Sequence, residues 1–394
     1  MRSEPQACAS HADRQTPTIA APFPRREPVE GTRFEARPPE DARCVRKAAC
    51  KAVRRAARGT EKGCLIRAPP RGYHDAPSSS VFEKEPGREP MIVDCFTHTW
   101  ESADQLGRCL PRSGGGQQGP PLDPRETRPD RHLAAAEPVD CTFVLGFVSR
   151  HLAAEIPNEW VASYVRSHPE RLIGFAGIDP SDPKRAVARL QQAREEWGMP
   201  GIAVAPAAQG FHPTNSQAML VYAAAAERHM PAIFHTGVFL ARETMLEYAR
   251  PVLLDEVARE FPDWPIVIAH LGHPWVGETM ELLAKHPNVY AETSWILHQP
   301  WLAYQALLRA YECGVMDKLL FGSGFPQSTA STCIEALYSI NHLAHGTNLP
   351  TIPREQLRGI VERDTLSALG IARPAGMPPS PSPRPAPETV GEEN

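Results

Sequence analysis

The stretch Met91-Ile-Val-Asp-Cys-Phe-Thr-His-Thr-Trp100 decides the fold of this chain. It begins as a short apolar strand and continues into residues spaced two apart, Asp94, Phe96 and His98. Because side chains on a strand alternate between its two faces, these three are predicted to point the same way. Two histidines spaced two apart at a strand end commonly begin a metal site, and here only His98 is a histidine.

From Met91 onward, short apolar runs alternate with amphipathic segments, which is typical of repeated βα units around a parallel sheet. The expected strands are 91–95, 142–147, 172–178, 202–205, 232–235, 266–270, 289–292 and 319–322. The expected helices are 183–197, 216–229, 245–261, 276–286, 301–313, 332–343 and 354–369. This pattern predicts an α/β fold, a (β/α)8 TIM barrel, although a doubly wound sheet of eight strands would share it.

The two ends of the chain differ in composition from its middle. Residues 1–90 are rich in Pro, Arg and Ala and show neither a helical nor a strand period, so we predict a disordered extension and a native start near Met91. Residues 373–394 repeat Pro and Ser and end in acidic residues, which predicts a disordered tail. The barrel domain is therefore expected over 91–372, with the Gly- and Pro-containing loop 112–130 as an insertion.

Composition and charge exclude several classes of partner. The net charge of −4 gives no reason to expect nucleic acid or an anionic membrane as partner. The nine cysteines are scattered and lack CxxC spacing, so they do not indicate a disulfide framework. We therefore expect the protein to reside in the reducing cytosol. Apolar runs are too short to span a bilayer and the N-terminus has no signal-peptide core, so we expect a soluble cytoplasmic protein.

Ionisable residues follow several expected strands. His98, His235 and His270 come at the ends of the first, fifth and sixth, and Glu292 ends the seventh. In a TIM barrel these ends form the reactive face. A single histidine there is more often a hydrogen-bonded structural residue, but three on separate strands favour a catalytic site for Zn²⁺ or a similar ion. His273, next to a proline, is expected to be structural or to support the site.

The order of several motifs resembles the amidohydrolase-related family, in the branch that includes aminocarboxymuconate-semialdehyde decarboxylase, over residues 91–372. These motifs are Ile-Val-Asp-Cys-Phe-Thr-His (92–98), Pro-Glu-Arg-Leu-Ile-Gly-Phe (169–175), Ala-Gln-Gly-Phe-His-Pro (208–213), Pro-Ala-Ile-Phe-His-Thr-Gly (231–237), Ile-Ala-His-Leu-Gly-His-Pro-Trp (268–275) and Leu-Leu-Phe-Gly-Ser-Gly-Phe-Pro (319–326). The resemblance implies a metal-dependent barrel that hydrolyses or decarboxylates a small carboxylated substrate, and a homodimer. It also implies a metal held by a His-x-His pair after strand one, a histidine after strand five and an aspartate after strand eight, with a catalytic histidine after strand six.

The match to that ligand set is incomplete. His98, His235 and His270 correspond to the second histidine of the pair, the strand-five ligand and the catalytic histidine, respectively. Phe96 stands in place of the first histidine, and Gly324 in place of the aspartate. Phenylalanine cannot coordinate a metal, and glycine supplies no carboxylate. Two hypotheses therefore stay open: a hydrolase or decarboxylase with a rearranged zinc site, or a catalytically inactive pseudoenzyme that binds a small molecule or a protein partner.

Overall fold

The structure is a computed structural model that describes residues 91–109, 127–237 and 241–374. The predicted extension 1–90, most of the loop 112–130 and nearly all of the tail 373–394 lie outside these ranges.

The central element is a parallel sheet of eight strands, counted over the described residues, in the order β1-β2-β5-β6-β7-β8-β9-β10. Its strands are β1 Val93–Thr97, β2 Cys141–Leu145, β5 Leu172–Gly177, β6 Gly201–Val204, β7 Ala232–Phe234, β8 Ile266–Ile268, β9 Val289–Glu292 and β10 Leu319–Leu320. The Cys95 backbone N–H donates to the Phe321 carbonyl at 3.0 Å, and Thr97 bridges to Phe325, so the last strand returns to the first. The predicted TIM barrel is confirmed.

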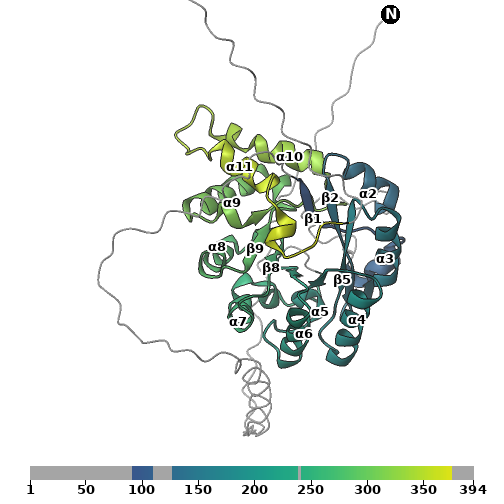
Figure 1. Ribbon diagram of the computed structural model, residues 1–394. Helices are drawn as coiled ribbons and strands as arrows, with labels where there is room; N and C mark the ends of the chain where they lie inside the picture. The colour runs from purple at the N-terminus through teal and green to yellow at the C-terminus, as the bar shows by residue number, and fades with distance from the viewer. Residues whose placement is uncertain (1–90, 110–126, 238–240, 375–394) are drawn as a thin grey trace, which may run out of the picture. The chain divides into compact units, whose positions relative to one another are not determined.

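Helices surround the strands in Figure 1. The α-helices are α2 Pro129–Ala135, α3 Asn158–Ser167, α4 Pro183–Glu195, α5 Pro206–Gln209, α6 Ser216–Glu227, α7 Asp255–Glu260, α8 Val276–Lys285, α9 Pro300–Glu312, α10 Ala330–Tyr338, α11 Arg354–Val361 and α12 Thr365–Ala368. The short 3-10 helices are η1 Ala103–Cys109, η3 Leu246–Ala249, η4 Pro251–Leu254, η5 Ala269–Gly272, η6 Ile296–His298, η7 Met316–Lys318 and η8 Ile340–Ala344. Asp182 and Asn215 cap α4 and α6 by accepting backbone N–H groups of the first turn.

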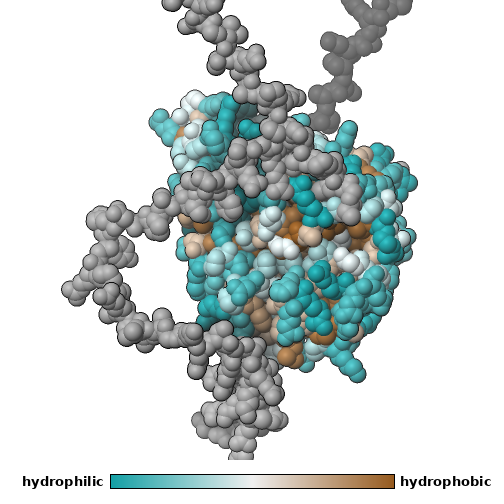
Figure 2. Space-filling model, viewed as in Figure 1, coloured by the Kyte–Doolittle hydropathy of each residue, from teal (hydrophilic) through white to brown (hydrophobic). Residues whose placement is uncertain are grey.

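The core has two layers because each strand is buried on both faces. Val267 belongs to the cluster inside the barrel, whereas its neighbours Ile266 and Ile268 pack between the barrel and the helices. This explains why the strands read as continuous apolar runs in the sequence. Leu366 of α12 and Leu369 pack into the interior cluster beside Val93 and so close the amino end of the barrel. In Figure 2 hydrophilic side chains dominate the rim of helices, and hydrophobic ones gather near the centre of this face.

Several predicted boundaries were wrong. The helix expected over 245–261 is broken into η3, η4 and α7, because Pro251 has no N–H to donate and holds Arg250 in an extended conformation. The helix expected over 354–369 ends at Val361, and Asp364 caps a new helix, α12. The first strand runs over Val93–Thr97 and not 91–95.

A small antiparallel hairpin follows β2 at the carboxyl end of the barrel. It consists of β3 Phe147–Ser149 and β4 Ala154–Ile156. Gln209 of α5 donates to the carbonyls of Val148 and Ile178, at 2.7 Å each, and so ties the hairpin to the barrel. Helix α3 follows this hairpin. Neither element was among the expected ones, and the three-residue strands of the hairpin carry little alternation to detect.

Among the described residues, every helix is too short or too polar to cross a bilayer.

Candidate functional site

The carboxyl ends of β1, β7 and β8 bring three histidines together around one phenylalanine. The Phe96 ring centroid lies 5.3 Å from that of His98, 4.9 Å from that of His235 and 4.7 Å from that of His270, each in a T-shaped arrangement. The centroids of His98 and His235 are 5.1 Å apart, and those of His235 and His270 are 6.1 Å apart. Phe96 is only 2% exposed. The side chain that replaces the expected first histidine therefore sits among the other three.

Burial keeps these imidazoles neutral at pH 7. It lowers the pKa of His98 to about 4, and the Leu145 carbonyl 3.0 Å from Nδ1 opposes that shift in part. Because a carbonyl only accepts, Nδ1 of neutral His98 carries the proton and Nε2 the lone pair. Burial also lowers the pKa of His235 well below its usual range, as do His98 and His270 beside it. Neutral imidazoles cannot bind a carboxylate by charge.

His235 has one further neighbour, Phe147 of the hairpin, at a ring centroid distance of 6.1 Å. The described residues give its Nε2, which is buried, no hydrogen-bond partner. Two phenyl rings, those of Phe96 and Phe147, thus lie beside this imidazole, in addition to the imidazoles of His98 and His270.

His270 is held by a hydrogen-bond network at the ends of β8 and β9. Its backbone N–H donates to Oε1 of Glu292 at 2.6 Å, and its Nδ1 lies 2.7 Å from Oγ of Ser294. The Ser294 hydroxyl donates to the same Glu292 oxygen at 2.7 Å, so it accepts from Nδ1–H. Nδ1 of His270 therefore carries the proton in the neutral form. Burial lowers the pKa of His270 to about 3.

The backbone at His270 is unusual as well. His270 and Leu271 adopt left-handed conformations, with φ of 57° and 50°. Such a conformation costs about 1–2 kcal/mol per residue for a side chain other than glycine, so surrounding contacts must hold the turn. The short hydrogen bond from the His270 N–H to Glu292 is one of those contacts.

Glu292 is a fully buried carboxylate with three donors. Besides the two groups on Oε1, Oε2 accepts the Ser294 backbone N–H at 2.6 Å. Burial raises the pKa of Glu292 to about 7, against the lowering effect of these hydrogen bonds. Its role in this structure is to orient the turn at His270 and the Ser294 hydroxyl.

Asp94 accepts hydrogen bonds from the backbone and not from the imidazoles of the cluster. The register between β1 and β2 shifts between Asp94 and Thr97, so strict alternation does not run through 94–98. The Asp94 carboxylate accepts the backbone N–H groups of Phe96 at 3.3 Å and Ser323 at 2.9 Å. Burial raises its pKa to about 6. Asp94 thus fixes the backbone where β1 meets the segment after β10.

Gly324 contacts Phe96 through a backbone hydrogen bond. Its N–H donates to the Phe96 carbonyl at 3.0 Å. Its φ of 73° is left-handed, and a Cβ added there would lie 3.1 Å from Cβ of Ser294. A side chain at this position would therefore be strained, and it would fit only if Ser294 shifted by a few tenths of an ångström.

The donor set does not fit a metal ion of the kind that the sequence comparison implies. Over the described residues, no group of three or more His, Cys, Asp or Glu side chains is arranged to hold one ion. His98 and His235 are brought together, but Phe96 contributes a phenyl ring and Gly324 contributes no side chain. Zinc, the metal expected from the sequence, has no suitable set of ligands here.

The remaining site residues have supporting roles. His273 lies beside Trp295, with ring centroids 4.9 Å apart, and not in the histidine cluster. Sequence reasoning missed Phe147 and Ser294. The polar residue two places after Glu292 repeats the spacing seen at the end of β1, and this spacing is the signal that could have identified Ser294.

Comparison with known proteins adds a family and a fold. A family model described as amidohydrolase matches residues 93–362. No curated protein matches the chain significantly.

Solved structures share the barrel at low sequence identity. A TIM-barrel protein of Bordetella bronchiseptica has a TM-score of 0.56 at 20% identity, covering 71% of this chain and 99% of that one. The 5-carboxyvanillate decarboxylase of Sphingomonas paucimobilis has a TM-score of 0.53 at 12% identity, covering 72% and 99%. A dihydroxybenzoic acid decarboxylase of Polaromonas, with bound manganese, has a TM-score of 0.51 at 14% identity, covering 71% and 97%. At these identities the likeness shows the fold alone.

Proposed function

The chain belongs to the amidohydrolase family. We propose that it is a member in which the side chain of Phe96 occupies the place of the metal centre. In this proposal the barrel binds a small molecule and does not carry out metal-dependent hydrolysis or decarboxylation. One observation carries the proposal: the Phe96 ring lies within 5.3 Å, centroid to centroid, of all three histidines.

The position of Gly324 also supports the proposal. Restoring a carboxylate there meets a left-handed backbone and the side chain of Ser294. The backbone hydrogen bond between Gly324 and Phe96 also joins the two altered positions. Both changes therefore belong to one rearranged corner of the barrel, where β10 returns to β1.

A second candidate is a metal-dependent hydrolase or decarboxylase with a rearranged site. The pairing of His98 with His235 favours it, as does the manganese bound in the structurally similar Polaromonas decarboxylase. It requires Phe96 to leave the cluster, because its ring touches both imidazoles. The first candidate needs no such movement.

Metal content distinguishes the two. Full-length protein is purified from cells grown with excess Zn²⁺ and Mn²⁺, and the metal is measured by plasma mass spectrometry. The proposal predicts substoichiometric metal, unchanged in His235→Ala and in the control His229→Asn, whose histidine is exposed and outside the cluster. Stoichiometric metal that His235→Ala removes, and the control does not, would overturn it.

The ligand is sought separately, by native mass spectrometry of gently purified protein. A bound small molecule that Phe96→Trp displaces supports a binding role in the barrel. Protein without any bound molecule, from every growth condition tried, would contradict that role.

A further inference from the structure

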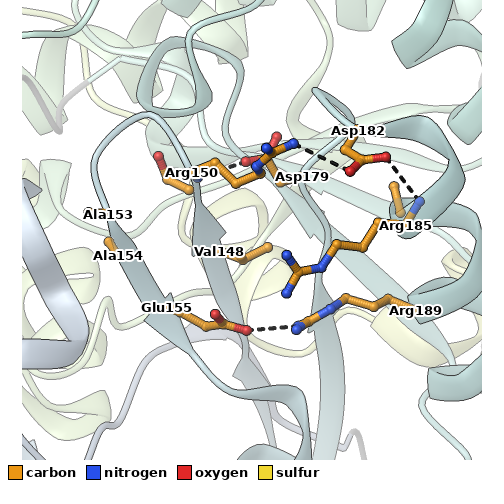
Figure 3. Close-up of a pocket in the computed structure, with 11 residues that line it drawn as sticks. Val148, Arg150, Ala153, Ala154, Glu155, Asp179, Asp182, Arg185 and Arg189 are labelled. Carbon is orange, nitrogen blue, oxygen red and sulfur yellow. Dashed lines mark hydrogen bonds and ion pairs between the residues drawn. The ribbon is translucent and has the colours of Figure 1, made fainter.

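A cavity of about 290 Å³ lies outside the histidine cluster, between the β3–β4 hairpin and the start of α4 (Figure 3). Three arginines line it. Arg150 follows β3, and Arg185 and Arg189 lie one turn apart on α4. Residues four apart on a helix share a face, so both α4 guanidinium groups reach the same space.

Two of the arginines are already paired. The Arg150 guanidinium lies 3.4 Å from Oδ2 of Asp182, and that of Arg189 lies 2.8 Å from Oε1 of Glu155. The third acid, Asp179, accepts backbone N–H groups from Arg150 at 2.8 Å and from Ser181 at 3.0 Å. Five of the six oxygens of these three carboxylates therefore already accept a hydrogen bond.

Arg185 differs from the other two. Its side chain extends from α4 toward Val148 in Figure 3, and within the described ranges no carboxylate forms an ion pair with it. Its backbone N–H donates a hydrogen bond to Oδ1 of Asp182 at 3.2 Å. A guanidinium has five N–H donors in a rigid fork, and the exposed side chain of Arg185 lines the cavity. The cavity thus has more hydrogen-bond donors than acceptors to offer a ligand.

We propose that this cavity binds a small organic carboxylate, with the carboxylate group in the fork of Arg185. The planar guanidinium matches a carboxylate in geometry as well as charge. Val148, Ala154 and Ala186 supply an apolar surface for the hydrocarbon part, which inorganic phosphate does not have. The volume is near the lower end of the roughly 300–1,000 Å³ found for small-molecule sites, which selects a small ligand.

The experiment titrates the full-length protein with benzoate, succinate and inorganic phosphate by calorimetry at low salt. We expect an organic carboxylate to bind more tightly than phosphate, and Arg185→Gln to weaken that binding by about tenfold or more, the loss of one charge-assisted bidentate contact. Arg194→Gln removes an exposed arginine from the last turn of the same helix and is expected to leave the affinity unchanged.

The proposal would be overturned by no heat from either carboxylate, by an equal loss of affinity in both variants, or by an unchanged affinity in Arg185→Gln. The last would place the ligand elsewhere, for example in the barrel. Phosphate binding as tightly as the carboxylates would also overturn it, because the apolar surface would then contribute nothing. Metal content does not enter this test, so its outcome is independent of the proposed function.

Discussion

Two neighbouring parts of the barrel's carboxyl end have been built in opposite ways. At β8 and β9, side chains make the connections: His270, Ser294 and Glu292 share hydrogen bonds of 2.6–2.7 Å. At β1 and β10, the backbone N–H of Gly324 donates to the carbonyl of Phe96, and the only side chain that these two residues contribute is the phenyl ring. Both corners contain a buried carboxylate that accepts backbone N–H groups, but only Glu292 is linked through Ser294 to a histidine, whereas Asp94 holds backbone beside a phenyl ring and a glycine.

The largest effect is expected from removing the ring. Phe96→Ala leaves a cavity among three histidines and is expected to lower the free energy of unfolding by about 3–5 kcal/mol, measured by denaturant titration. Phe96→Leu keeps most of the volume and is expected to cost less than about 1.5 kcal/mol. Equal small costs for both variants would show that the ring does not hold this corner together.

The polar corner is expected to depend on Ser294. Ser294→Ala leaves Glu292 and His270 each without one hydrogen-bond partner, at a cost of about 1–3 kcal/mol in unfolding free energy. Ser331→Ala, at an exposed position on α10, is the matched control and is expected to change stability by less than about 0.5 kcal/mol. If Ser294→Ala and Ser331→Ala lower the free energy of unfolding by the same amount, the hydrogen bonds of Ser294 add no stability.

Gly324 can be compared with another glycine of similar conformation. Gly314 has a φ of 69° and no heavy atom within 4 Å of a Cβ added there, whereas Gly324 has a φ of 73° and the Ser294 Cβ lies 3.1 Å from an added Cβ. Gly314→Ala therefore measures strain alone, about 1–2 kcal/mol. We expect Gly324→Ala to lower the free energy of unfolding by more than Gly314→Ala does, because the added methyl group crowds Ser294. Equal costs would show that this corner has room for a side chain after all.

Stability should fall in acid, with contributions from both corners. The pKa is lowered by desolvation for buried His132 and His270 and for half-buried His98 and His235. Because an unfolded histidine titrates near 6.5, the unfolded chain takes up protons below that pH while the folded one does not, and stability is lost. The raised pKa values of Asp94 and Glu292 act in the opposite sense, because the folded chain binds those two protons first.

Four histidines outweigh two carboxyl groups, so the thermal midpoint is expected to fall from pH 7 to pH 5. Thermal unfolding followed by circular dichroism measures it. A midpoint that rises over this range would mean that the two carboxyl groups dominate.

Much of the barrel could be predicted because its strands are buried on both faces and so stand out as apolar runs. Prediction failed where a single residue interrupts an element or where the element is very short. Pro251 divides a segment whose apolar pattern otherwise suits one helix. The β3–β4 hairpin has strands of only three residues, too few to show a period.

The candidate site could be predicted in part. The family pattern identified Phe96 and Gly324 as departures, and the structure places them next to each other. That one ring contacts all three histidines depends on the register shift in β1 and on strand ends far apart in the sequence. The Ser294 bridge depends on the turn at His270, whose left-handed backbone has no marker such as glycine. These are tertiary effects that local pattern does not encode.

The central claim, that Phe96 occupies the position where a metal would bind, is tested most directly by titrating the metal-free full-length protein with Mn²⁺ and following free Mn²⁺ by electron paramagnetic resonance. The account predicts that the wild type leaves the Mn²⁺ signal as intense as buffer alone does. Uptake of one Mn²⁺ per chain, abolished by His235→Ala, would contradict it.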